Sequence, residues 1–98
     1  MISVVGDLDA HGAIAMDRVI EQVLAGQTFK IMVNCIQLDY ISSAGMGVFI
    51  SHVRDIRASG GALVFFGLRQ NVKMAFGLLG LEKVFTIVET EDEAKQAL

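Results

Sequence analysis

Hydrophobic residues occur along the chain in two alternating patterns, continuous runs and runs spaced by three and four residues. The continuous runs have the length of short strands and the composition of strands that are buried in a sheet. They predict four strands, at Ile2–Val5, Phe29–Ile36, Ala62–Phe66 and Val84–Val88. The first of these is followed by Gly6-Asp7-Leu8-Asp9, which we expect to end it.

The spaced runs predict helices, because residues three and four apart share one face of a helix. They cover 12–24, 44–59, 71–79 and a short segment from Thr90 to Leu98. Gly26, Gly60 and Gly80 follow the first three runs, as glycine often does at helix ends. Thr90, with Glu93 three residues later, has the pattern of a capping box and predicts the start of the last helix.

The predicted order is therefore strand and helix in strict alternation, which is typical of an α/β fold with helices packed on a sheet. We expect a mixed, largely parallel sheet of about four strands with about four helices. The 98 residues contain no proline and no low-complexity stretch that would mark a linker. The length suits one domain, and we expect residues 1–98 to form it.

Composition limits the classes of function. The chain is 53% hydrophobic with a mean hydropathy of +0.54, which predicts a well-formed core and suggests an exposed apolar patch. Its net charge is −3 and its eight basic residues are scattered, so we expect no nucleic-acid partner. No apolar run reaches the ~18 residues of a membrane span, so we expect no direct membrane insertion. Cys35, alone in its apolar run, predicts a buried thiol, and the lack of a disulfide framework favours a cytoplasmic location.

The segment from Asp39 to Val48 is the most informative part of the sequence. Ser42 and Ser43 lie where the second helix is expected to begin, and either can cap it. Gly45 and Gly47 follow in the first turns, where each lowers helix stability by about 1 kcal/mol relative to alanine. Two explanations remain open at this point. Bare backbone admits a partner surface or a phosphate, or else small residues are needed for tight packing of the helix on a strand.

Two further motifs occur at fixed intervals from this turn. Gly6-Asp7-Leu8-Asp9 precedes the first helix, and Gly80-Leu81-Glu82-Lys83-Val84-Phe85 joins the third helix to the last strand. Together with the turn Ile41-Ser42-Ser43-Ala44-Gly45, and in this order, they resemble the STAS family of anti-sigma factor antagonists. The resemblance extends over nearly the whole chain.

The resemblance implies a phosphorylation switch rather than catalysis. In that family an anti-sigma factor that is itself a serine kinase phosphorylates the serine at the start of the second helix, and a serine phosphatase removes the phosphate. The unphosphorylated form binds the anti-sigma factor and frees the sigma factor. The phosphoacceptor position falls on Ser43, and Ser42 stands where the family often has aspartate.

The same resemblance implies a partner-binding surface around this turn. It comprises Asp9, Asp39, Ser42, Ser43, Gly45 and Gly47. Further along the second helix, Arg54, Asp55 and Arg57 are either a polar rim of that surface or ordinary solvated charges. The chain also departs from the family by beginning at what resembles its second strand. We therefore expect a trimmed first helix and sheet edge, or an unpaired edge strand.

Other functions are less consistent with the residues present. A G-x-S-x-G nucleophile turn would need glycine at position 41, which is isoleucine, and neither His11 nor His52 is expected within reach of a serine. There is no dinucleotide fingerprint and no metal-ligand spacing along the chain. We therefore expect no catalytic residue, no cofactor and no metal. The remaining alternative is a STAS subunit of a signalling assembly, or of a lipid or anion transport system.

Overall fold

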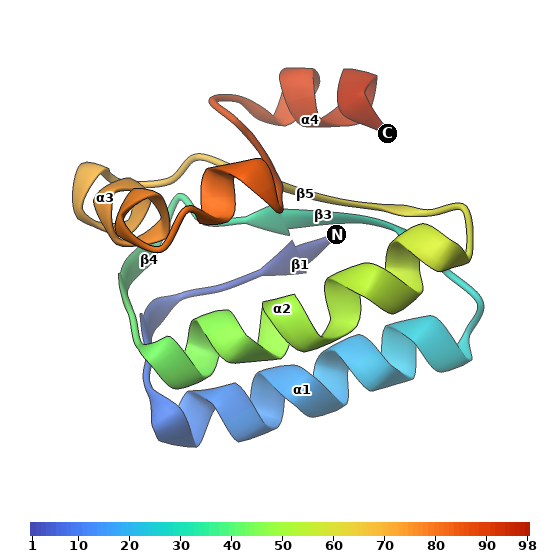
Figure 1. Cartoon of the computed structure of the whole chain (residues 1–98), viewed down its shortest axis with the longest axis horizontal. Helices are drawn as coiled ribbons and strands as arrows, with labels where there is room; N and C mark the ends of the chain where they lie inside the picture. The colour runs from blue at the N-terminus through green and yellow to red at the C-terminus, as the bar shows by residue number, and fades with distance from the viewer.

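The computed structural model describes all 98 residues and contains a four-stranded parallel sheet with helices on both of its faces (Figure 1). The strands lie in the order β1 (Ile2–Ser3), β3 (Lys30–Asn34), β5 (Ala62–Phe66) and β6 (Thr86–Val88). All three ladders are parallel, so the sheet contains no antiparallel pair. Parallel neighbours need crossover connections, and the helices of the chain provide them. The predicted α/β class and four-stranded sheet are confirmed.

Four α-helices are present, as predicted. They are α1 (Ala10–Ala25), α2 (Ser43–Ala58), α3 (Gln70–Leu78) and α4 (Glu91–Ala97). Helices α1 and α2 lie side by side on one face of the sheet, and α4 packs on the other face against β5 and β6. Thr90 caps α4 by accepting a hydrogen bond from the Glu93 amide at 3.2 Å, as the capping pattern indicated. No helix is both long and apolar enough to cross a bilayer.

The central strand β5 shows why its sequence is a continuous apolar run. Leu63 and Phe65 point into the main core, whereas Val64 and Phe66 pack on the opposite face with Ala94 of α4. Side chains alternate between the faces of a strand, so a strand covered on both sides must be apolar at every position. This arrangement places the sheet in the middle of the molecule.

The main core is built around Phe65. Its ring makes edge-to-face contacts with Phe49 of α2 and Phe76 of α3, at centroid distances of 5.0 and 5.6 Å. Cys35 is buried in the same core, with 1% of its surface exposed. Burial raises the pKa of the Cys35 thiol to about 12. The predicted burial of Cys35 is therefore confirmed.

A second, smaller ladder was not predicted. Strands β2 (Gly6–Leu8) and β4 (Leu38–Ile41) pair in parallel, with Leu8 opposite Ile41. The prediction that Gly6-Asp7-Leu8-Asp9 merely ends the first strand was wrong. Gly6 has a φ of 77°, which turns the chain out of β1 so that the next residues pair elsewhere. The turn expected between Ile36 and Ala44 likewise contains β4.

Several strand boundaries differ from the prediction, since β1 ends at Ser3 rather than Val5 and β3 spans Lys30–Asn34 rather than Phe29–Ile36. The last strand begins at Thr86 rather than Val84, because a 3₁₀ turn, η1 (Leu81–Lys83), precedes it and the Phe85 amide donates back to the Leu81 carbonyl. Helix α1 has 16 residues, as many as α2. Strand β1 lies at an edge of the sheet and pairs with β3, so the expected unpaired edge strand is not found.

Candidate functional site

Two helix N-termini lie close together at one end of the molecule (Figure 1). Strand β2 leads into α1, whose N-cap is Asp9, and β4 leads into α2, whose N-cap is Ser42. Because β2 and β4 are paired in parallel, their carboxyl ends, and hence the two helix starts, meet at the same edge. Neighbouring helix starts place free amides and the positive ends of two helix dipoles in one small region.

The Ser42 side chain holds the two helix starts together. Its hydroxyl donates a hydrogen bond to the Leu8 carbonyl at 3.0 Å and accepts one from the Gly45 amide at 3.1 Å. The Ser42 amide donates to the same Leu8 carbonyl at 2.9 Å. Ser42 is half-buried, and its hydroxyl both donates and accepts a hydrogen bond. The structure therefore assigns the N-cap to Ser42, a choice that the sequence left open.

Ser43, the next residue, is in a different situation. It is the first residue of α2, it is exposed, and its hydroxyl makes no hydrogen bond within the chain. The first amides of a helix have no partners within that helix. The Gly45 amide is taken by Ser42, which leaves the amides of Ser43 and Ala44 for an anion attached there. A phosphoryl group on Ser43 Oγ would therefore lie in solvent, next to donors and at the favourable end of the α2 dipole.

The two glycines of the turn have different roles. A Cβ atom on Gly45 would lie 2.9 Å from the Leu8 carbonyl oxygen and 3.1 Å from Ile41 Cγ1, so Gly45 is required for packing. Gly47 is exposed, and a Cβ atom there would meet nothing within 4 Å. Of the two explanations that the sequence left open, tight packing applies to Gly45. Only Gly47 remains as bare backbone that a partner could approach.

The two acidic residues of the predicted surface are also engaged in different ways. Asp9 caps α1 by accepting a hydrogen bond from the Gly12 amide at 2.8 Å, and it immediately follows Leu8, the residue that Ser42 contacts. Asp39 lies on β4 and forms an ion pair with Arg69, at the start of α3. Asn71 donates to the Asp39 carbonyl at 2.7 Å.

The predicted surface residues thus form two groups. Asp9, Ser42, Ser43, Gly45 and Gly47 gather around the paired helix starts, whereas Asp39 is held toward α3 by Arg69. Sequence reasoning did not find Arg69 and Asn71, because the charge pair with Asp39 joins residues thirty positions apart. No local pattern indicates a contact of that kind.

Exposed apolar side chains occur near this end of the molecule. Ile36, in the turn before β4, and Tyr40 on β4 are exposed, and Met74, Leu78 and Leu79 are exposed on or after α3, which packs against β4. This agrees with the exposed apolar surface that the composition suggested.

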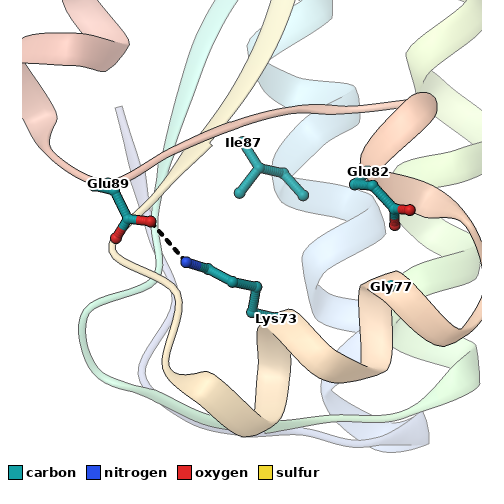
Figure 2. Close-up of a pocket in the computed structure, with 5 residues that line it drawn as sticks. All are labelled: Lys73, Gly77, Glu82, Ile87 and Glu89. Carbon is teal, nitrogen blue, oxygen red and sulfur yellow. Dashed lines mark hydrogen bonds and ion pairs between the residues drawn. The ribbon is translucent and has the colours of Figure 1, made fainter.

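Two surface hollows of about 390 Å³ each lie outside the turn. One lies between α3 and β6 and is lined by Lys73, Gly77, Glu82, Ile87 and Glu89 (Figure 2). Its single cation, Lys73, already pairs with Glu89 at 2.7 Å. The other hollow contains Arg54 and Arg57 of the predicted rim, and Arg57 donates to the Val84 carbonyl. Asp55 is exposed nearby on the same helix.

Neither histidine is bonded to the serines of the turn. His11 is exposed in the first turn of α1. His52 packs between α1 and α2, where its Nε2 atom lies 2.6 Å from Asp17 Oδ1. Neither makes a hydrogen bond to Ser42 or Ser43, which agrees with the expectation that no histidine acts as a base toward either serine.

The sequence profile of the STAS domain matches residues 1–94. The anti-sigma-B factor antagonist of Listeria monocytogenes is 27% identical over 92 residues, which cover 94% of this chain and 81% of that protein.

Solved structures with the same fold include TM1081 of Thermotoga maritima, a candidate anti-sigma factor antagonist. It has a TM-score of 0.88 and 22% identity, over 94% of this chain and 80% of that one. The Bacillus cell fate determinant SpoIIAA in its phosphorylated form has a TM-score of 0.72 and 23% identity, over 97% of this chain and 86% of that one. At 22% and 23% identity, the structural likeness shows that these proteins share a fold and nothing more.

Proposed function

The chain belongs to the STAS domain family, and from this premise we propose that it is an anti-sigma factor antagonist switched by phosphorylation of Ser43. In this proposal the unphosphorylated protein binds a partner anti-sigma factor that is also a serine kinase. The kinase transfers the γ-phosphoryl group of ATP to Ser43 Oγ, and a serine phosphatase removes it by hydrolysis. A protein with such partners acts in the cytoplasm, by binding and not by catalysis.

The observation that supports Ser43 most strongly is the contrast between the two serines of the turn. The Ser42 hydroxyl is half-buried and bonded to the Leu8 carbonyl and the Gly45 amide. Phosphorylating Ser42 would break the contact that joins the two helix starts. Ser43 is exposed and free of such contacts, so a kinase can reach it without unfolding α2.

The fold should tolerate the phosphate. A phosphoserine carries about −1.5 to −2 charges at neutral pH, and a negative charge in the first turn of a helix is favourable by about 0.3–1 kcal/mol. The neighbouring acids are already engaged, Asp39 with Arg69 and Asp9 with the Gly12 amide. We therefore expect phosphorylation to leave the stability of the domain nearly unchanged.

Partner binding should not tolerate the phosphate. In the proposed complex the partner closes over Ser43 and the bare backbone of Gly47, where a bulky dianion would have to be buried without a countercharge. A penalty of ~2.7 kcal/mol already corresponds to a hundredfold loss of affinity. The switch would therefore act on the interface and not on the fold.

A binding assay with matched variants tests this proposal. The affinity for a cognate anti-sigma kinase is measured by calorimetry for the original protein, Ser43→Asp, Ser43→Ala and Gln96→Glu. We expect Ser43→Asp to bind at least tenfold more weakly and Ser43→Ala to bind as the original does. Gln96→Glu adds the same charge on the exposed surface of α4, on the opposite face of the sheet, and should have no effect. Equal losses for Gln96→Glu and Ser43→Asp would contradict the proposal.

The position of the binding face can be tested separately. We propose that it includes the turn from Asp39 to Gly47, the Asp9 turn and the exposed side of α2 with Arg54. Addition of the partner should shift the backbone amide signals of these segments in a nuclear magnetic resonance spectrum. Shifts confined to α4 would place the interface on the wrong face and reject this part of the proposal.

A further inference from the structure

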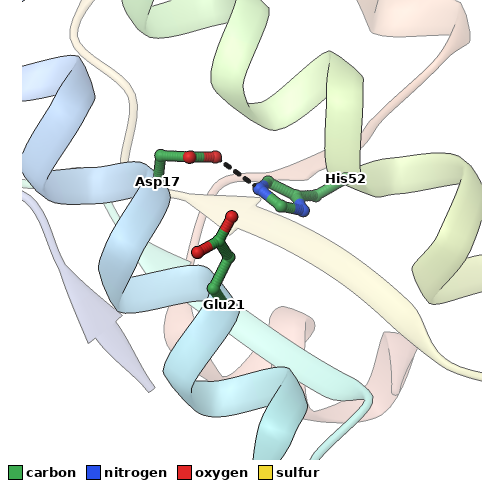
Figure 3. A group of neighbouring side chains, drawn as sticks. All are labelled: Asp17, Glu21 and His52. Carbon is green, nitrogen blue, oxygen red and sulfur yellow. Dashed lines mark hydrogen bonds and ion pairs between the residues drawn. The ribbon is translucent and has the colours of Figure 1, made fainter.

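Three potential metal ligands converge on the seam between α1 and α2, away from the serine turn. Asp17 and Glu21 lie four residues apart on one face of α1, and His52 reaches them from α2 (Figure 3). One ligand atom from each side chain lies within 4.8 Å of the other two. The His52 side chain is 13% exposed and the Asp17 side chain 42%, so solvent and small ions reach the cluster from one side.

Apart from His52, the two carboxylates of this cluster have no basic partner. No lysine or arginine forms an ion pair with Asp17 or Glu21, and the Glu21 carboxylate makes no hydrogen bond within the chain. Among the other acids, Asp39, Glu89 and Glu91 each pair with a basic side chain, whereas the rest, like Glu21, have no such partner. The two carboxylates therefore have His52 as their only basic neighbour, and a divalent cation bound between the three side chains would balance their negative charge.

We propose that Asp17, Glu21 and His52 bind one divalent transition-metal ion of the Zn²⁺ class. Imidazole nitrogen and carboxylate oxygen are ordinary ligands of Zn²⁺, and three protein ligands with a water in the fourth position form a known type of zinc site. The imidazole selects for metals such as Zn²⁺ over Mg²⁺ and Ca²⁺, which prefer oxygen ligands alone. Nothing in the STAS assignment or in the proposed switch requires this site.

The geometry needs only a small adjustment to admit the ion. Zinc–ligand distances of about 2.0–2.2 Å and a tetrahedral angle place two ligands about 3.4 Å apart. His52 Nε2 and Asp17 Oδ1 are 2.6 Å apart, so their separation must open by roughly 0.8 Å. Asp17 is half-buried and Glu21 is exposed, and both can move by this amount through side-chain rotation.

Binding also requires that the ring proton of His52 lie on a particular nitrogen. Nε2 must offer its lone pair to the metal, so the neutral imidazole of His52 carries its proton on Nδ1 in the bound state. The hydrogen bond from Nε2 to Asp17 is then replaced by two bonds to the ion.

The rest of the chain offers little competition for the ion. Cys35, the only thiol, is buried in the core. His11, the only other histidine, is exposed on α1 and does not belong to the cluster. The expectation from the sequence that the protein holds no metal rested on ligand spacing along the chain. This site joins two helices, so it has no such linear signal, and our proposal replaces that expectation.

Titration of the untagged protein with Zn²⁺ alone tests the site. Calorimetry, with competition against a zinc-responsive dye, measures stoichiometry and affinity for the original protein, His52→Gln, Glu21→Gln and His11→Gln. We expect one ion per chain with micromolar affinity. We expect His52→Gln and Glu21→Gln to bind about tenfold or more weakly, since even groups that only support a ligand are worth 10–100-fold. His11→Gln should bind as the original does.

Two further readouts keep the result unambiguous. Glutamine at position 52 can still hydrogen-bond to Asp17, so His52→Gln should fold, which far-ultraviolet circular dichroism checks. Zn²⁺ should raise the melting temperature of the original protein and of His11→Gln, and raise it much less in His52→Gln. The proposal would be overturned by non-saturable binding, by one ion shared between two chains, or by an equal loss in His11→Gln.

Discussion

Replacing each glycine of the turn by alanine gives a pair of variants with opposite expected effects on stability. Gly45 and Gly47 lie on the same helix, two residues apart, and the mutation is chemically identical at both. At Gly45 the new methyl group would lie 2.9 Å from the Leu8 carbonyl oxygen and 3.0 Å from Leu8 Cγ, so backbone must move. At Gly47 it would meet nothing within 4 Å.

The magnitudes follow from these contacts. Overpacking a well-packed site costs about 1–3 kcal/mol, and alanine returns up to about 1 kcal/mol of helix propensity. Gly45→Ala should therefore lower the free energy of unfolding by about 1–2 kcal/mol. Gly47→Ala should raise it by about 0.5–1 kcal/mol, because only the propensity term applies. The two variants should thus differ by about 2 kcal/mol.

Urea unfolding followed by circular dichroism measures this difference. With a slope of about 1–3 kcal/mol per molar urea for a small domain, the two midpoints should be separated by roughly 1 M. Thermal unfolding should give the same order of stability. If Gly45→Ala were as stable as Gly47→Ala, the close approach of α2 to β2 would be wrong, and with it the explanation of why glycine stands at position 45.

Three further outcomes are expected. Ser42→Ala should lose about 0.5–2 kcal/mol of unfolding free energy by urea unfolding, because it removes the α2 cap and the bond to Leu8, whereas exposed Ser43→Ala should change it little. Gly47→Ala should bind the anti-sigma partner more weakly than the original protein despite its higher stability; unchanged affinity would remove Gly47 from the interface. Burial raises the pKa of Cys35 from 9.0 to about 12, so the unfolded chain loses this proton first. Above pH 9 ionisation of Cys35 in the unfolded chain should therefore lower the free energy of unfolding, by on the order of 1 kcal/mol at pH 10. The pH dependence of urea unfolding should lose this component in Cys35→Ala, and an identical dependence in both proteins would refute it.

The larger elements of the fold could be predicted because their patterns are local. The run at Ala62–Phe66 is apolar at every position, and the strand found there has the same bounds. The helix starts at Thr90 and near Ser42 follow from residues that lie within four positions of each other. Patterns of this kind require no knowledge of what the segment packs against.

The small ladder of β2 and β4 could not be predicted for the same reason. Strand β4 has buried ends and an exposed middle, Leu38 and Ile41 being buried while Asp39 and Tyr40 are exposed, so it lacks the alternation that indicates a strand. Strand β2 has only three residues, and its pairing depends on the turn at Gly6. Both strands exist because they pair with each other across more than thirty residues.

The candidate site shows the same division. The two serines and two glycines could be selected from sequence, but their roles could not be separated. The roles depend on Leu8, which approaches Ser42 and Gly45 from a different strand. The cluster of Asp17, Glu21 and His52 was missed altogether, because its members are assembled only when α1 and α2 pack side by side.

The central claim, that the exposed hydroxyl of Ser43 is the switch, is tested most directly by intact-mass spectrometry. The original protein, Ser43→Ala and Ser42→Ala are incubated with a cognate anti-sigma kinase and ATP. We predict a single added phosphate on the original protein and none on Ser43→Ala. Ser42→Ala should still be phosphorylated, with slower transfer expected because the turn has lost its cap. Phosphate on Ser43→Ala but not on Ser42→Ala, or on neither the original protein nor any variant, would contradict this account.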